Sequence, residues 1–226
     1  VAAGYNAFPI DLRAHGESGG HYMTPGYLEA LDILGAVDAA RGRGASGAFV
    51  ALGHSSGAVA ALQAGARSSE IAAVIADGAF ISADRVLERA AAIVGRDAHA
   101  SAAEKLALRV ANRLLHSSWG RGFANYAFWV RTGVRMDAHD ADALPAIARL
   151  GVRPVLFIVG QQDGIATPED AREMYEAAAS PQKALLVIPG AGHNTTYSAA
   201  PDEYAGEVLR FLTAALASGA PVVHGK

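Results

Sequence analysis

The pentapeptide Gly53-His54-Ser55-Ser56-Gly57 places a serine hydroxyl between two glycines, at a spacing that favours nucleophilic chemistry. An apolar run precedes it and a run of small residues with helical spacing follows it, so Ser55 would lie at a sharp turn between a strand and a helix. Such a turn strains the serine backbone and exposes its hydroxyl at the carboxyl edge of a sheet. The same residues could instead form a Gly/Ser-rich connection without chemistry.

A serine nucleophile needs a general base, in most cases a histidine that a carboxylate orients. His193 follows the apolar run Ala184–Ile188, at the end of a loop of small residues. Asp163 follows the apolar run Pro154–Val159. Because the loops after parallel strands share one edge of a sheet, we expect both side chains near Ser55. The pattern predicts His193 as the base and Asp163 as the acid that fixes its tautomer.

Neighbouring residues offer alternatives for these roles. Asp77 follows the apolar run Ala72–Ala76 and is the rival acid, although the order serine, Asp163, histidine favours the later carboxylate. His54 adjoins the nucleophile, but at a sharp turn its side chain would point elsewhere. Ser56 is more useful through its backbone N–H, which would hold a developing oxyanion. His193 itself could be a plain surface-loop residue.

Two further patterns are rejected as cofactor or metal sites. The segment 42–47 fits G-x-G-x-x-G, but it precedes a strand, whereas a dinucleotide-binding loop follows a strand and opens a helix. Asp11, His15, Glu17 and His21 lie close in sequence at a spacing that matches no metal-binding motif. We therefore expect neither a cofactor nor a metal.

Apolar runs alternate with helical patterns along the chain, which is typical of a parallel α/β sheet. The predicted strands are Tyr5–Ile10, Ala48–Leu52, Ala72–Ala76, Pro154–Val159 and Ala184–Ile188. The predicted helices are Pro25–Arg41, Gly57–Arg67, Thr167–Ala179 and Asp202–Leu216. The third helix has a clear start: Thr167 as the N-cap, Pro168 at the first position, then two acids against the helix dipole.

The stretch from about Ser82 to Leu150 contains no convincing strand and reads as amphipathic helices. We expect residues 1–226 to form a single domain in which about 82–150 is a helical cap insertion. The aromatic residues of this stretch are Phe123, Tyr126, Phe128 and Trp129. We expect them to pack the core of the insertion; the alternative is a cap that lines a substrate pocket.

Composition excludes several classes of protein. The 226 residues are 51% hydrophobic, with a net charge of −3 and no cysteine. The sequence has no basic stripe that would bind nucleic acid and no apolar run long enough to span a membrane. It also shows no signal peptide, and without cysteine it offers no thiol chemistry. We therefore expect a cytoplasmic protein that acts on a small molecule, and a homo-oligomer is compatible with the sequence.

Three blocks together resemble the α/β-hydrolase superfamily. Asp11-Leu12-Arg13-Ala14-His15-Gly16-Glu17-Ser18 is similar to the D-x-R-G-H-G-x-S segment after the family's fourth strand, and the pentapeptide around Ser55 to its nucleophile elbow. Asp163 and His193 lie in blocks that resemble its acid and histidine loops. More loosely, the chain is similar to serine aminopeptidase S33 and BEM46-like hydrolases. The resemblance implies a serine hydrolase that cleaves an acyl substrate through a Ser-His-Asp triad and an acyl-enzyme.

The resemblance also has a departure. The family has three strands before the D-x-R block, and the loop after the third supplies the second oxyanion N–H; the printed sequence has no room for them. We therefore expect the sequence to be the C-terminal part of a longer protein. The preferred activity is cleavage of a carboxylic ester, or of a thioester or amide. The alternatives are a catalytically silent binding module, and a haloperoxidase or carbon–carbon hydrolase with the same triad.

Overall fold

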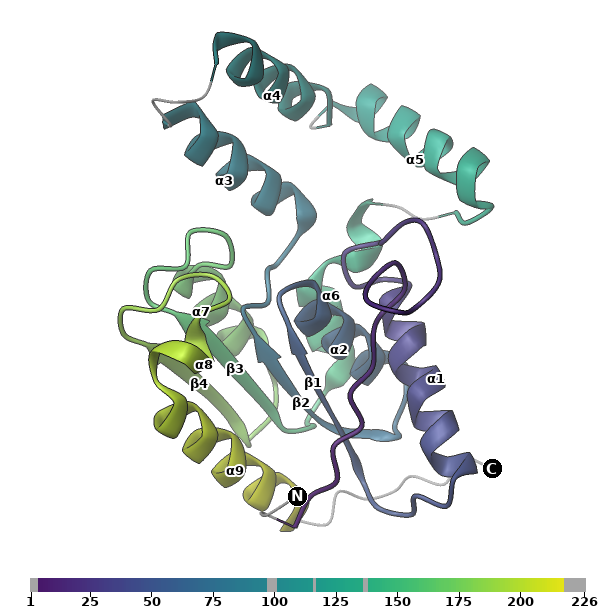
Figure 1. The fold of residues 1–226 in the computed structure, drawn as a ribbon, viewed down its shortest axis with the longest axis vertical. Helices are drawn as coiled ribbons and strands as arrows, with labels where there is room; N and C mark the ends of the chain where they lie inside the picture. The colour runs from purple at the N-terminus through teal and green to yellow at the C-terminus, as the bar shows by residue number, and fades with distance from the viewer. Residues whose placement is uncertain (1–3, 97–100, 116, 136–137, 218–226) are drawn as a thin grey trace.

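A parallel sheet of four strands forms the centre of the computed structural model, which describes residues 4–96, 101–115, 117–135 and 138–217 (Figure 1). In spatial order the strands are β1 (Phe49–His54), β2 (Ile71–Asp77), β3 (Val155–Gly160) and β4 (Lys183–Ile188). The register aligns Leu52 with Ile75, Ile75 with Leu156, and Leu156 with Ala184. All strands run the same way, so the loops that follow them meet at one edge.

Alternate residues of the central strands are buried on opposite faces of the sheet. Val74 and Phe157 point into one core, and Ile75 and Leu156 into the other. The first core is covered by α1 (Glu29–Gly42), α2 (Ser56–Arg67), α6 (Ala143–Leu150) and α7 (Pro168–Ala177). The second is covered by α9 (Pro201–Ala217), which follows the short helix α8 (Thr196–Ala199). Burial on both faces explains why these strands read as continuous apolar runs.

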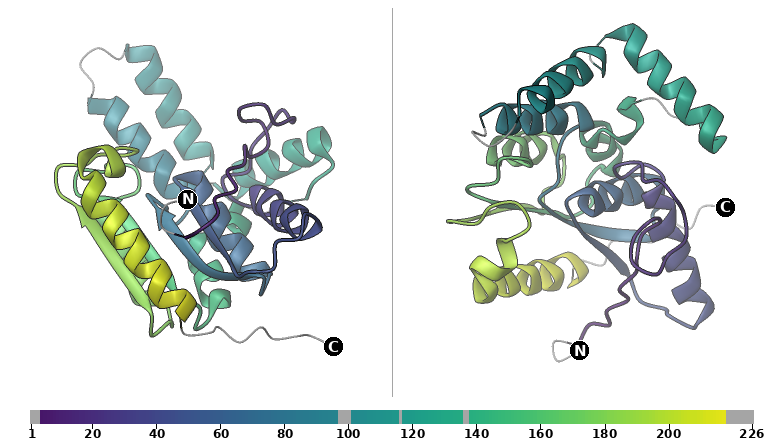
Figure 2. Two further views of the ribbon diagram at one scale, coloured as in Figure 1. Left: turned by 60° about the horizontal axis from the view of Figure 1, so that its bottom comes forward. Right: turned by 45° about the horizontal axis from the view of Figure 1, so that its top comes forward.

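Between β2 and β3 the chain forms helices, with no strand among its described residues. They are α3 (Ala83–Arg96), α4 (Ala102–Leu115), α5 (Ser118–Thr132), the short 3₁₀ helix η1 (Ala138–Ala141) and α6. Figures 1 and 2 show α3, α4 and α5 standing beyond the carboxyl edge of the sheet, whereas α6 packs against α2. The part of the insertion that stands apart from the sheet is therefore α3 to α5.

The expectation that the aromatic residues pack the core of the insertion is wrong for most of them. The side chains of Phe123 and Tyr126 are 67% and 59% exposed, and Trp129 is also exposed. Phe128 packs edge-on against Tyr22 of the N-terminal segment, with ring centroids 5.4 Å apart. The physical reason is geometric: α5 packs along α4, and no further layer of helix or strand covers its outer face (Figure 1).

The predicted strand Tyr5–Ile10 is also wrong. The segment carries no strand structure, and its residues from Asn6 to Ile10 are exposed. Among the described residues β1 pairs with β2 alone, so this segment takes part in no ladder. A β-strand requires backbone hydrogen bonds to a neighbouring strand, and an apolar segment without such a partner remains irregular.

Within the described residues, the structure contains no helix that is both long and apolar enough to cross a bilayer.

Candidate active site

Ser55 lies at the turn between β1 and α2 with φ 53° and ψ −119°, a backbone conformation that is strained for any residue except glycine. Its N–H donates to the backbone oxygen of Asp77 at 2.8 Å, which ties the turn to the end of β2. Gly53 makes the turn sterically feasible, because a Cβ there would lie 2.0 Å from the backbone oxygen of Gly57. The strained conformation that the sequence predicts for Ser55 is therefore present.

We expect Gly53→Ala to lower the free energy of unfolding by about 3 kcal/mol or more, since the added methyl group would meet backbone atoms that cannot move aside. The matched control is Gly35→Ala in the exposed middle of α1, where a Cβ would meet nothing within 4 Å. That change should raise stability by about 0.5–1 kcal/mol, because alanine favours a helix. Urea unfolding of both variants measures the difference. A loss below about 0.5 kcal/mol for Gly53→Ala would show that the strand and helix can separate without cost.

The structure brings Ser55, His193 and Asp163 into one hydrogen-bonded line. Ser55 Oγ lies 3.0 Å from His193 Nε2, and His193 Nδ1 lies 2.7 Å from Asp163 Oδ2. A carboxylate can only accept, so Nδ1 carries the proton and Nε2 accepts from the serine hydroxyl. This is the arrangement in which the imidazole can take a proton from the serine.

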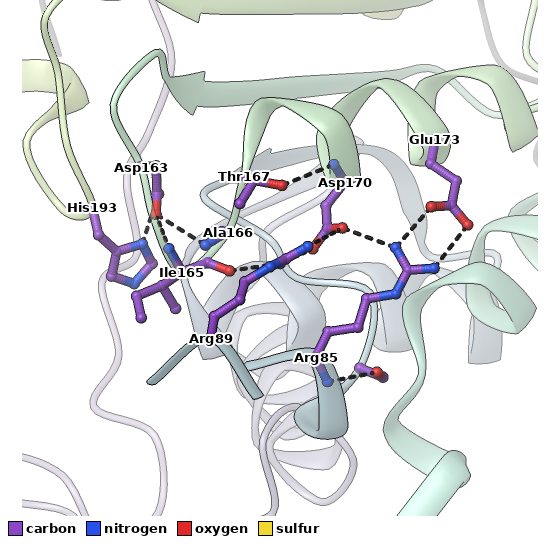
Figure 3. A network of polar contacts seen from close by, with 10 residues as sticks. Arg85, Arg89, Asp163, Ile165, Ala166, Thr167, Asp170, Glu173 and His193 are labelled. Carbon is purple, nitrogen blue, oxygen red and sulfur yellow. Dashed lines mark hydrogen bonds and ion pairs between the residues drawn. The ribbon is translucent and has the colours of Figure 1, made fainter. Parts of the chain in front are cut away.

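Asp163 is held on its other oxygen by the backbone. Its Oδ1 accepts the N–H groups of Ile165 at 2.8 Å and Ala166 at 2.9 Å, and the residue is buried. These two donors fix the rotation of the carboxylate, so that Oδ2 points at His193 (Figure 3).

The loops that carry Asp163 and His193 are joined to each other by their backbones. The Gln162 N–H donates to the oxygen of Ala191 at 2.8 Å, and the Gln161 N–H to that of Ile188 at 2.9 Å. A Cβ on Gly160 would lie 2.4 Å from the Ala191 oxygen, so a glycine is needed where the loops approach. Gly160, at the end of β3, therefore permits the close contact between the two loops.

Asp77, the rival acid, lies at the same edge but has other partners. Its Oδ2 accepts the hydroxyl of Thr196 at 2.8 Å and lies 3.7 Å from His54 Nε2. The His54 ring is tilted against the His193 ring, with centroids 5.9 Å apart. Of the two carboxylates, Asp163 is the one that is hydrogen-bonded to His193 Nδ1. Asp77 instead links the end of β2 to α8, immediately after the histidine loop.

Sequence reasoning missed several residues that pack around this edge. Gly78 lies beside the rings of His54 and His193, and its φ of 62° is the reason for a glycine, since a Cβ there would meet His193 Cε1 at an ordinary contact distance of 3.6 Å. Thr196 and Tyr204 both contact Asp77, and burial raises the pKa of the Tyr204 phenol, with the Asp77 charge acting in the same direction. The pair Asp77-Gly78 after an apolar run is the one signal in the sequence that could have pointed here.

Burial raises the pKa of the Asp77 carboxyl, while the hydrogen bond from Thr196 and the nearby His54 oppose the shift. The folded state therefore favours the protonated form, and stability that is present below the unfolded pKa of about 3.9 is lost as the pH rises through the folded pKa. Asp77→Asn removes this titration and keeps an oxygen that can accept from Thr196. We expect the stability of Asp77→Asn relative to the wild type to increase as the pH rises from about 4 to 7. Urea unfolding across that range tests it; a difference that does not change with pH contradicts it.

Ser56 is the first residue of α2, and its N–H is among the four that a helix leaves without an intrahelical acceptor. The positive end of the helix dipole lies at the same place. A negative oxygen bound to Ser55 would therefore meet a donor and a favourable field.

The residues considered for a metal site make local contacts instead. The Asp11 carboxylate accepts the Glu17 N–H at 3.0 Å, and His15 Nδ1 lies 2.9 Å from the backbone oxygen of Arg13. In the ranges that the structure describes, no group of three or more histidines or acidic residues is arranged to hold a metal. The glycine-rich segment 42–47 connects the end of α1 to β1.

Comparison with known proteins gives the chain a family. A model of the alpha/beta hydrolase family matches residues 1–207. The uncharacterized protein YqkD of Bacillus subtilis (strain 168) is 29% identical over 213 residues, which cover 92% of this chain and 62% of that protein. The chain thus spans less than two thirds of the length of this curated relative.

Solved structures of the same fold include an esterase and a lipase. The Pyrococcus furiosus esterase Pf2001 is 25% identical, with a TM-score of 0.70 over 95% of this chain and 73% of that one. The Paleococcus ferrophilus monoacylglycerol lipase is 19% identical, with a TM-score of 0.59 over 95% of this chain and 85% of that one, and shares the fold. With the family model matching most of its length and the sheet, elbow and flanking helices in place, the chain belongs to the alpha/beta hydrolase family.

Proposed function

We propose that this chain is a serine hydrolase that cleaves a carboxylic ester of a small molecule through an acyl-enzyme. One observation carries the proposal: Ser55, at a strained turn, shares a continuous line of hydrogen bonds with His193 and Asp163. The likeness to the esterase Pf2001, at 25% identity, supports an ester as the substrate class.

The geometry supports the following steps. Ser55 Oγ attacks the carbonyl carbon while His193 Nε2 takes the hydroxyl proton, and the Ser56 N–H stabilises the oxyanion of the tetrahedral intermediate. The protonated imidazole, oriented by Asp163, then gives its proton to the departing alcohol, which leaves an acyl group on Ser55. Water attacks the acyl-enzyme with the same assistance from His193, releases the carboxylic acid and restores the serine.

An ester makes the smallest demand on this site. The described residues supply one assigned oxyanion donor, the Ser56 N–H, and a missing donor typically costs about 2.7–4 kcal/mol of transition-state stabilisation. An alcohol is a better leaving group than an amine, so ester cleavage tolerates such a loss better than amide cleavage. Thioesters and amides are therefore the secondary candidate substrates for Ser55, His193 and Asp163.

The single assigned oxyanion donor also favours a second candidate, a binding module without catalysis. A fluorophosphonate probe and hydrolysis of p-nitrophenyl acetate separate the two. The hydrolase should turn over the ester and carry one covalent label, on the peptide that contains Ser55, because the probe reacts only with an activated serine. A protein that binds the ester without turnover and stays unlabelled would be the binding module.

A further inference from the structure

Two arginines one turn apart on α3 attach this helix to α7 (Figure 3). Arg85 and Arg89 both donate to the buried carboxylate of Asp170, at 2.9 Å from Arg85 Nη1 and 2.8 Å from Arg89 Nη2. Arg85 continues outward to Glu173, with 2.7 Å between Arg85 Nη1 and Glu173 Oε2. The helix that leads from β2 into the insertion is therefore clamped to the helix that follows the Asp163 loop.

Arg89 makes one contact that Arg85 lacks: its Nη1 also donates to the backbone oxygen of Ile165 at 2.8 Å. That oxygen belongs to the peptide group whose N–H is that of Ala166, and this N–H donates to Asp163 Oδ1 at 2.9 Å. One peptide group thus accepts from the guanidinium on one side and donates to the carboxylate on the other. The line of hydrogen bonds at the site therefore extends from Arg89 through Asp163 and His193 to Ser55.

A cation on a peptide oxygen polarises the peptide group and strengthens its N–H as a donor, since hydrogen bonds in a chain reinforce one another. The contact also fixes the plane of the peptide, and with it the direction from which Oδ1 of Asp163 is held. Ala166 and Asp163 are both buried, so water competes little with these bonds. The hydrogen bonds to Asp170 raise the pKa of the Arg89 guanidinium further above its ordinary value, so it stays charged.

We propose that Arg89 is a positioning residue for the hydrolysis proposed above: through the Ile165–Ala166 peptide it holds the Asp163 carboxylate against His193, and it thereby makes the alignment of Ser55 depend on the placement of α3. This inference rests on the proposed function for its effect on turnover, and on geometry alone for its effect on the His193–Asp163 hydrogen bond. Arg85 also holds α3 on α7 through Asp170 and Glu173, but it does not touch the Ile165–Ala166 peptide, so of the two arginines Arg89 alone makes the contact that leads to Asp163.

The test compares Arg89→Met with the matched control Arg85→Met, since each removes one arginine from the same clamp. With p-nitrophenyl acetate we expect Arg89→Met to lower kcat about tenfold with KM within about twofold, and Arg85→Met to keep both values near the wild type. Arg89→Lys keeps a charge that reaches one acceptor, so it should recover part of kcat. Labelling by the fluorophosphonate should slow in the same order.

A second readout does not depend on turnover. The proton on His193 Nδ1 gives a downfield NMR resonance while it is held by Asp163, and we expect Arg89→Met to shift it and to speed its exchange with water, with no change in Arg85→Met. If Arg89→Met does not fold, Arg89→Lys gives a weaker form of the comparison: a smaller shift of the resonance and a partial loss of kcat, with neither change in Arg85→Met. Equal losses of kcat in both methionine variants, or an unaltered resonance in Arg89→Met, would overturn the proposal. A wild type without turnover whose resonance responds to Arg89 alone would refute the hydrolase and support the positioning role.

Discussion

Ester hydrolysis should fall by roughly 10⁴- to 10⁶-fold in Ser55→Ala, because the substitution removes the atom that forms the bond to the substrate. The structure shows the Oγ of this residue on His193 Nε2, at the start of the line that ends on Asp163. What remains after the substitution would be the modest acceleration that binding and the helix N-terminus supply. Initial rates with p-nitrophenyl acetate, measured at equal protein concentration, give the ratio.

The fold should survive this substitution. Alanine has the same Cβ as serine, so the strain at φ 53° is unchanged, and the backbone bond from Ser55 to Asp77 remains. We therefore expect urea unfolding of Ser55→Ala to match the wild type within about 0.5 kcal/mol.

Ser56→Ala is the matched control, since it removes a neighbouring hydroxyl and keeps the backbone N–H at the start of α2. Its activity should stay within about tenfold of the wild type, far above that of Ser55→Ala. The fluorophosphonate should label Ser56→Ala and leave Ser55→Ala unmodified. Retained turnover in Ser55→Ala would remove Ser55 from the mechanism.

The sheet could be predicted from the sequence because its strands are buried on both faces. Each of the four observed strands overlaps a predicted apolar run, and the boundaries differ by a residue or two. The largest difference is at β1, which continues to His54, inside the predicted turn. The ladder with β2 explains this, because His54 still pairs with Asp77. Hydrogen bonding to a neighbouring strand can therefore extend a strand beyond the last residue of its apolar run.

The prediction of Tyr5–Ile10 failed for the complementary reason. Its nearly continuous run of apolar residues indicates a tendency to be buried, but it carries no information about which strand lies beside it. The start of α7 was predicted well, since the Thr167 side chain accepts the Asp170 N–H as an N-cap does. The sequence pattern placed Asp170 there for the helix dipole, whereas its carboxylate binds two arginines 81 and 85 residues away.

The candidate site shows the same division between local and distant information. The order of Ser55, Asp163 and His193 and their places after strands were enough to predict that they would meet. The distant contacts around them were not predictable: Thr196 on Asp77, and Arg89 on the Ile165 oxygen, depend on how α8 and α3 pack. A sequence can therefore identify the groups that react before it identifies those that hold them.

Asp163→Asn should lower kcat about 10⁴-fold while the fold is retained, and the backbone around it explains why. The N–H groups of Ile165 and Ala166 both donate to Oδ1, so the asparagine oxygen must occupy that side. Its NH₂ group then faces His193 Nδ1, where the wild type has an acceptor. The imidazole has to present an unprotonated Nδ1 to that donor, which moves its proton to Nε2. In this tautomer His193 cannot accept the proton of Ser55, and attack on the ester stops.

The control for this variant is Asp77→Asn, because it makes the same chemical change in the other carboxylate at the edge of the sheet. Asp77 contacts Thr196 and His54, so the tautomer of His193 should persist and kcat should stay within about tenfold of the wild type. Rates with p-nitrophenyl acetate and the downfield Nδ1 resonance would be measured for both variants. A large loss in Asp77→Asn with a small one in Asp163→Asn would make Asp77 the acid that serves His193. That result would require the histidine loop to rearrange during the reaction, since in the folded chain it is Asp163 that holds the ring.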